Sequence, residues 1–226
     1  MNFPAWPSQL GRDAYVVTDA NVRDLATLDA WIAMDEALLV ICGDALSGKS
    51  HLASIAAQGL GCGIWLVAEN GGINHAIASQ PGNQPGNKGA VVLDGMERLS
   101  DRSRLLEFIE EVRRENRRLV LVGNGGPVEW AGAVVDLATR LKAAPQLETS
   151  RPDEALMRGV LTKLVAERQL SVPREVIEFA ASQLPRRIDR AVAYAGALET
   201  LVAGSTNRLS IRLATIALES IDTFKG

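Results

Sequence analysis

The sequence predicts an α/β fold in which a parallel sheet is flanked by helices and followed by a small all-helical domain. Short apolar runs of four to six residues alternate with helix-like segments through the first 150 residues, as in open parallel sheets. After residue 152 the sequence contains only helix-like segments. Aromatic residues make up 4% of the chain, so alanine, valine and leucine must form most of the core.

The composition indicates a globular protein. The 226 residues are 47% hydrophobic and 23% charged with a net charge of −3, which excludes a disordered chain and argues against a generally basic nucleic-acid surface. Every apolar stretch is shorter than the roughly 18 residues of a spanning helix, and the N-terminus lacks the pattern of a signal peptide. Cys42 and Cys62 make neither a disulfide framework nor a zinc cluster, so we expect a reducing, cytoplasmic compartment and no membrane contact.

The elements of the first 150 residues begin with a helix at 19–34, where Val22, Leu25, Leu28 and Ile32 share one face. Further helices are expected at 49–58 and 101–114, and strands at 37–42, 64–68, 90–94 and 119–122. The first two of these strands are expected to be buried, because they are continuously apolar. The run QPGNQPGNKG at 80–89 opposes regular structure through its Pro-Gly and Gly-Asn pairs.

The helical spacing after the α/β region predicts helices that begin near residues 153, 173, 188 and 210. A proline suits the first turn of the second, and a serine suits the N-terminal cap of the last. The shift in composition places a domain boundary near residues 149–152. We therefore expect an N-terminal segment at 1–14, an α/β domain at 15–150 and a helical domain at 151–226.

One motif carries a defined chemistry. It matches G-x-x-x-x-G-K-[ST], follows an apolar run and opens a helix, and it consists of Gly43, Asp44, Ala45, Leu46, Ser47, Gly48, Lys49 and Ser50, with His51 next. Its glycines let backbone N–H groups turn towards phosphate oxygens, and the helix N-terminus favours the same anion. Lys49 supplies charge for the outer phosphates, and the Ser50 hydroxyl is a ligand for Mg²⁺. The alternative is an ordinary glycine-bearing turn with an exposed lysine.

Two further polar residues end neighbouring strands. Asp94 closes the run VVLD at the carboxyl edge, where it either holds Mg²⁺ through water or caps the strand. Gly95 follows at a position where many nucleotide hydrolases carry a second acid, so we expect weak intrinsic hydrolysis. Asn124, within GNGG, either reaches a γ-phosphate or the attacking water, or is a turn asparagine with positive φ.

Three segments together resemble the DnaA-related AAA+ ATPase family, and within it the short Hda branch most of all. These segments are GDALSGKSHL, VVLDGMERL and residues 136–192, and the resemblance runs from about Tyr15 to the end of the chain. It implies a P-loop AAA+ module followed by a helical lid, with ATP or ADP and Mg²⁺ as ligands.

The resemblance also implies roles for individual residues. Tyr15, Val17 and Asn21 would lie near the adenine, while the phosphate and Mg²⁺ roles argued above stay with the loop and with Asp94. Asn124 falls at the family's sensor 1 position.

Two arginines match family positions outside the loop. Arg140, in ATRLK, matches the arginine that a subunit presents to its neighbour's nucleotide. Arg186, at the start of the third lid helix, matches the sensor 2 arginine. Each is alternatively a solvated arginine or part of a structural salt bridge.

The function implied by the resemblance is a regulator that promotes hydrolysis of DnaA-bound ATP and so limits initiation of DNA replication. DnaA is the expected partner, and a homo-oligomer is a further expectation. The sliding clamp is another candidate, although the docking peptide has diverged, because Gly11-Arg12 follows Gln9-Leu10 in place of further leucines. The chain stops after the lid without a basic helix-turn-helix domain, so sequence-specific DNA binding is not expected.

Two alternatives belong to other functional classes. One is a nucleotide-gated loader or adaptor that acts on a helicase or on single-stranded DNA, with contacts from Arg102, Arg104, Arg113, Arg114, Arg117 and Arg118. The other is a non-hydrolysing interaction module with a degenerate nucleotide-binding fold.

Overall fold

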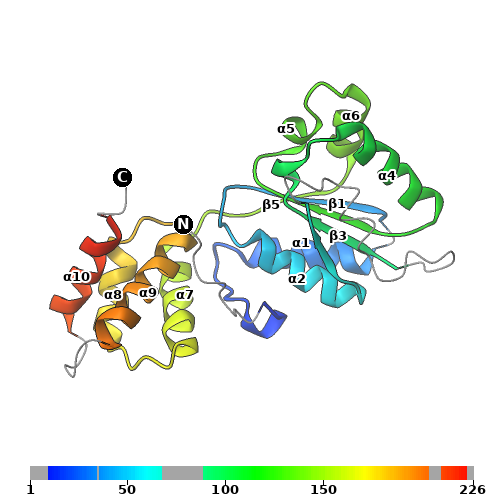
Figure 1. Ribbon diagram of the computed structural model, residues 1–226. Coiled ribbons are helices and arrows are strands. Elements are labelled where there is room, and N and C mark those ends of the chain that lie inside the picture. Colours follow the sequence, from blue (N-terminus) through cyan, green and yellow to red (C-terminus); the bar gives the residue numbers. More distant parts are fainter. Residues whose placement is uncertain (1–9, 35, 68–88, 204–209, 223–226) are drawn as a thin grey trace. The chain divides into compact units, whose positions relative to one another are not determined.

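The computed structural model describes residues 10–34, 36–67, 89–203 and 210–222 (Figure 1). These residues form two compact units. The α/β unit consists of Leu10–Tyr15 and Val22–Ser150, and the helical unit consists of Val16–Asn21 and the described residues from Arg151 onward. The segment Val16–Asn21, expected in the α/β domain, therefore groups with the helices. Residues 80–88 of the glycine- and proline-rich run, and all but the end of the expected clamp-docking segment, lie outside the described residues.

The α/β unit is built on a sheet whose described strands all run parallel, which confirms the predicted fold class. Its strands are β1 (Leu38–Cys42), β2 (Ile64–Leu66), β3 (Val91–Asp94), β4 (Leu119–Val122) and β5 (Gln146–Glu148). Their order is β2-β3-β4-β1-β5. Because parallel strands share one carboxyl edge, the segments that follow β1, β3 and β4 emerge side by side.

Helices cover both faces of this sheet (Figure 1). They are α1 (Val22–Ala33), α2 (Lys49–Leu60), α4 (Arg102–Arg114), α5 (Pro127–Ala131) and α6 (Val135–Ala143), with the 3₁₀ turns η1 (Arg12–Ala14) and η2 (Met96–Arg98). Successive residues of a strand point to opposite faces. Leu39 and Ile41 therefore pack with α1 and α2, whereas Val40 packs with α4, α5 and α6.

The buried face of α1 matches the prediction only in part. Leu28 is buried as expected and Trp31 is buried as well, whereas Val22 is 47% exposed. Asp24 is also buried, because its carboxylate accepts hydrogen bonds from the Ser150 backbone N–H at 2.9 Å and from its hydroxyl at 2.8 Å. The first turn of α1 thus holds the segment that leaves β5.

The expectation that β2 is a buried strand is wrong. It lies at the edge of the sheet, and Leu66 is 63% exposed. The residue that is fully buried, Val67, follows the strand and donates its N–H to the Asp94 carbonyl at 2.8 Å.

The helical unit contains α7 (Glu154–Glu167), α8 (Arg174–Gln183), α9 (Ile188–Ala203) and α10 (Ile211–Asp222). Asp153 caps α7 by accepting a hydrogen bond from the Leu156 N–H at 2.7 Å. Gly159 allows Val16 to pack on α7, since a Cβ at residue 159 would lie 2.5 Å from Val16 Cγ1. Within the described part of the chain, every helix is too short or too polar to cross a membrane.

Tyr194 of α9 sits in the core of the helical unit with its side chain fully buried. Its hydroxyl has no hydrogen-bond partner among the described residues. Burial also raises the pKa of Tyr194 to about 12, since the phenolate would lose its hydration.

We expect Tyr194→Phe to leave stability unchanged or to raise it, because an unpaired buried polar group costs about 1–3 kcal/mol. Between pH 10 and 12 the unfolded chain has released the tyrosine proton and the folded chain retains it, so rising pH favours unfolding. Wild-type stability should therefore fall more steeply than that of the variant across this interval. Urea unfolding followed by circular dichroism measures both effects, and a large loss of stability in the variant at neutral pH would contradict them.

Candidate functional site

The glycine-rich loop connects β1, in the interior of the sheet, to the N-terminus of α2. Three of its residues have positive φ, namely Gly43 at 139°, Leu46 at 60° and Gly48 at 98°. Gly48 is the N-cap residue of α2 and supplies no side-chain hydrogen bond to the first turn. A helix N-terminus with free N–H groups and a partial positive charge favours an anion.

The loop packs tightly against the end of β5. A Cβ at residue 43 would lie 2.3 Å from Thr149 Oγ1, so only glycine fits there. The Thr149 hydroxyl is 2.5 Å from Ser47 Oγ, and the Thr149 N–H donates to the Cys42 carbonyl at 2.9 Å. Thr149 thus supports the loop, a contact the sequence motif does not reveal because 102 residues separate the two hydroxyls.

Lys49 is a buried cation, with 6% of its surface exposed. Its ammonium donates hydrogen bonds to the Asp44 carbonyl and to Ser47 Oγ. Burial lowers the pKa of Lys49, and the carboxylates of Asp94, Glu97 and Asp44 act in the opposite direction. The Asp44 carbonyl and the Ser47 hydroxyl are neutral, so they solvate the Lys49 ammonium only in part. An anion bound by the loop would therefore stabilise the ammonium further. The alternative of an ordinary turn expected an exposed lysine, and Lys49 is buried.

Ser50 and Asp94 meet beside the loop. The Ser50 hydroxyl donates to Asp94 Oδ2 at 2.8 Å. Burial raises the pKa of Asp94, and the hydrogen bond from Ser50 opposes this effect. A hydroxyl and a carboxylate are hard oxygen ligands of the kind that Mg²⁺ uses together with phosphates and water, so the pair fits this ion.

Asn124 follows β4 at the same edge of the sheet. Its N–H donates to Glu97 Oε2 at 2.9 Å, and its carbonyl accepts from Trp130 Nε1 at 2.6 Å. The interpretation as a turn asparagine with positive φ is wrong, because the positive φ of 71° belongs to Gly125. Gly125 forms an antiparallel bridge with Gly43 and so joins the two loops. Glu97 is a polar residue of this site that the sequence analysis missed.

The residues expected near the adenine are divided between the two units. Tyr15 belongs to the α/β unit, where its ring packs edge-on against His51 with the ring centroids 4.9 Å apart. The His51 Nε2 is 2.9 Å from the Gly11 carbonyl, which ties the start of the described chain to α2.

Val17, Asn21 and Arg186 belong to the helical unit. Val17 is 46% exposed, whereas Asn21 is buried and its amide bonds the Val16 carbonyl and the Thr18 N–H, each at 2.8 Å. Arg186 is exposed and lies in the turn between α8 and α9. It was expected at the start of the third helix of the unit, but that helix begins at Ile188.

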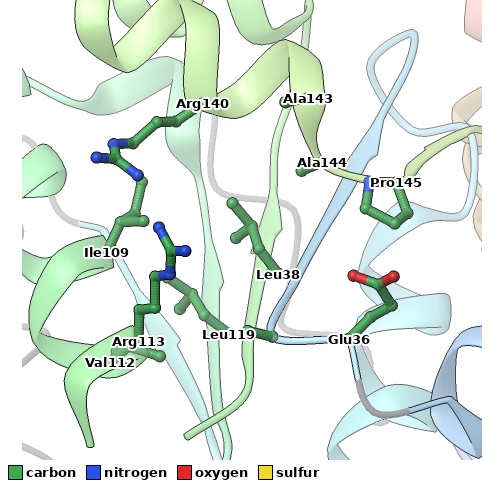
Figure 2. Close-up of a pocket in the computed structure, with 11 residues that line it drawn as sticks. Glu36, Leu38, Ile109, Val112, Arg113, Leu119, Arg140, Ala143, Ala144 and Pro145 are labelled. Atoms are coloured by element: carbon green, nitrogen blue, oxygen red, sulfur yellow. The ribbon is translucent and has the colours of Figure 1, made fainter. Parts of the chain in front are cut away.

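Arg140 lies at the opposite edge of the sheet from the loop. It is in the last turn of α6, and with Leu38 and Leu119, the first residues of β1 and β4, it lines a pocket of about 350 Å³. Its Nη1 is 2.7 Å from Glu110 Oε1, and 38% of its side chain is exposed. Figure 2 shows the guanidinium groups of Arg113 and Arg140 on one side of this pocket.

The contact between Gly43 and Thr149 generates a stability prediction. Gly43→Ala should destabilise the α/β unit by about 2–4 kcal/mol, from a strained φ and a steric clash. Adding Thr149→Ala removes the clashing hydroxyl and should recover part of that loss. Denaturant unfolding of both single variants and the double variant measures the coupling. Strictly additive effects would contradict the contact.

Sequence comparison matches neither a family model nor a curated protein. Solved structures do match. Domain III of DnaA from Thermotoga maritima superposes with a TM-score of 0.78 and 16% identity over 99% of this chain and 100% of that one. The Holliday junction branch migration motor RuvB, also from Thermotoga maritima, has a TM-score of 0.69 and 15% identity over 94% of this chain and 72% of that one.

AMPPCP-bound DnaA from Aquifex aeolicus has a TM-score of 0.62 and 15% identity, and the match covers 86% of this chain and 65% of that one. These superpositions establish a shared fold. The parallel sheet, the loop between β1 and α2 and the helices from Arg151 onward therefore have the fold of DnaA domain III and of RuvB.

Proposed function

We propose that the chain binds ATP or ADP, together with Mg²⁺, at the loop between β1 and α2. The observation that carries this proposal is the buried Lys49 ammonium beside a helix N-terminus that lacks a side-chain cap. A polyphosphate would neutralise the ammonium and accept hydrogen bonds from the first turn of α2. The likeness to a DnaA solved with AMPPCP, an adenine nucleotide analogue, supports the same class of ligand.

Each remaining residue of the site has a role in this proposal. Ser50 and Asp94 would hold Mg²⁺, which neutralises phosphate charge when bound. Asn124, one strand further along the sheet, would contact the γ-phosphate or the attacking water. Tyr15 would pack near the adenine.

We also propose nucleotide contacts for three residues of the helical unit. Val17 would provide an apolar contact for the adenine. Asn21 would act indirectly, because its side-chain amide hydrogen-bonds the backbone of Val16 and Thr18 and so fixes the conformation of this segment. Arg186, an exposed residue ahead of α9, would sense the nucleotide.

We further infer that Arg140 acts on a nucleotide held by another subunit. Its own phosphate loop lies at the carboxyl edge of the sheet, whereas Arg140 lines a pocket at the amino edge with Leu38 and Leu119. A partner whose nucleotide faces this edge could receive the guanidinium, which would neutralise charge that develops on the γ-phosphate. The ion pair with Glu110 leaves the side chain accessible and would have to open.

The partner that we propose is DnaA, so the chain would promote hydrolysis of DnaA-bound ATP and act as a negative regulator of replication initiation in the cytosol. Domain III of DnaA shares the fold over its whole length, which supports pairing between two modules of like shape. A homo-oligomer would use the same two edges. The sliding clamp stays a candidate partner through the N-terminal segment.

Four of the six arginines that a helicase or single-stranded DNA adaptor would use make contacts within the α/β unit. Arg102 donates to the Trp130 carbonyl, Arg104 to Glu111, and Arg117 to the Gly89 carbonyl. Arg118 stacks 4.0 Å from the Trp31 ring and donates to the carbonyls at the end of α1. Arg104 therefore pairs within α4, whereas the other three guanidinium groups link separate segments of the α/β unit.

Nucleotide binding is tested with Lys49→Ala. Because charge-assisted hydrogen bonds contribute about 1.5–3 kcal/mol, ADP affinity should fall roughly 10- to 100-fold. The melting temperature should stay level or rise, since the variant no longer buries a cation. Lys142→Ala, on α6 at the other edge of the sheet, is the matched control and should bind ADP normally in calorimetry. Equal affinity in both variants would reject the site.

The role of Arg140 is tested with Arg140→Ala in an assay of phosphate release from ATP preloaded on DnaA. Stimulation should be lost, since a guanidinium supplied in trans contributes about 10³- to 10⁵-fold in other nucleotide hydrolases. The chain's own ADP affinity should not change. Arg174→Ala, an exposed residue of α8 paired with Glu178, is the control and should stimulate fully. Full stimulation by the Arg140 variant would remove the proposed mechanism.

A further inference from the structure

The residue after Asp94 is glycine, and the backbone there explains why. Gly95 has a φ of 100°, and a Cβ would lie 3.2 Å from the Val67 carbonyl oxygen. An acidic side chain at this position would be strained by its φ and crowded by Val67. The chain therefore cannot carry a second acid directly after Asp94 without moving the edge of the sheet.

The same turn brings another carboxylate to this edge. Gly95 leads into η2, which packs so closely on the end of β4 that a Cβ at Gly123 would lie 2.8 Å from Met96. Glu97 is thereby placed beside Asn124, with Oε2 accepting the Asn124 N–H at 2.9 Å. Its other oxygen, Oε1, is 3.7 Å from Arg98 Nε, too far for a hydrogen bond, and 29% of the side chain is exposed.

Glu97 also belongs electrostatically to the phosphate site. Its charge acts to raise the pKa of Lys49, against the effect of burial, and the pKa of Asp94, and both residues belong to the site. It is thus the acid that lies near the lysine, the proposed Mg²⁺ ligand and the sensor position at once.

We propose that the Glu97 carboxylate orients the water that attacks ATP, in the role that an acid at position 95 has in many nucleotide hydrolases. This inference rests on the nucleotide binding proposed above. It predicts that the chain turns over its own ATP, in contrast to the weak hydrolysis expected from Gly95.

In this reaction the water oxygen forms a bond to the γ-phosphorus while the bond from that phosphorus to the β–γ bridging oxygen breaks. ADP leaves with the electron pair of the broken bond. Glu97 accepts a hydrogen bond from the water and takes its proton, which is then released to solvent. The Oε2 contact with the Asn124 N–H fixes the carboxylate during this step.

The test compares Glu97→Gln with wild type and with Glu129→Gln. The glutamine oxygen can still accept the Asn124 N–H, so the variant keeps the structural contact and loses only the carboxylate. Glu129, in α5, lies beside Gly125 at the same edge but is not among the charges that shift Lys49 or Asp94. ADP and ATP affinity, melting temperature and single-turnover ATP hydrolysis with Mg²⁺ are measured for all three proteins.

We expect unchanged affinity and melting temperature in Glu97→Gln, with hydrolysis slower by about 10²-fold or more, the usual contribution of a positioned acid or base. Glu129→Gln should hydrolyse ATP like wild type. Equal rates in wild type and Glu97→Gln, or equal losses in the two variants, would overturn the role of Glu97. If the wild-type protein binds ATP without hydrolysing it, the role of Glu97 is also overturned, but the proposal of nucleotide binding is supported. If the wild-type protein binds neither ATP nor ADP, the proposed function itself is rejected.

Discussion

A positive charge withdrawn from water at the carboxyl edge of the sheet is the interaction on which the rest of the site depends. Lys49 is buried where α2 begins, and burial disfavours its charged form. The charge is tolerated because the loop turns the Asp44 carbonyl and the Ser47 hydroxyl inward and because Asp94 and Glu97 lie near it. Those neighbours come from the ends of different strands, so the parallel sheet assembles the environment that no local segment provides.

The parallel strands also place the candidate phosphate site and Arg140 at opposite edges of the sheet. Its carboxyl edge gathers the loop, Asp94 and Asn124, whereas its amino edge carries the pocket lined by Arg140. Under the proposed function, one subunit would present a nucleotide site at one edge of the sheet and Arg140 at the other. This arrangement suits head-to-tail contact between modules of the same fold, in which one edge meets the opposite edge of its neighbour.

The sequence predicted the features that depend on neighbouring residues. The run VVLD, the strand LVLV and the loop from Gly43 to Ser50 are local patterns, and the structure has them where they were expected. Features set by distant parts of the chain were missed. The edge position of β2 depends on strand order, Thr149 reaches the loop from β5, and Glu97 is positioned by the backbone at Gly95 and Gly123. α5 was missed because its five residues are too few for a helical period to be visible.

The segment Val16–Asn21 packs with the helices although Tyr15 and Val22, on either side of it, belong to the α/β unit. The chain therefore crosses between the units at 15–16, at 21–22 and again at 150–151. Cleavage of the chain after Ser150 would leave Val16–Asn21, which belongs to the helical unit, on the fragment that holds the α/β unit. Gly159 would then lose its contact with Val16. Neither unit is therefore a single continuous stretch of sequence. A recombination that exchanges the helical unit between related proteins would have to include Val16–Asn21.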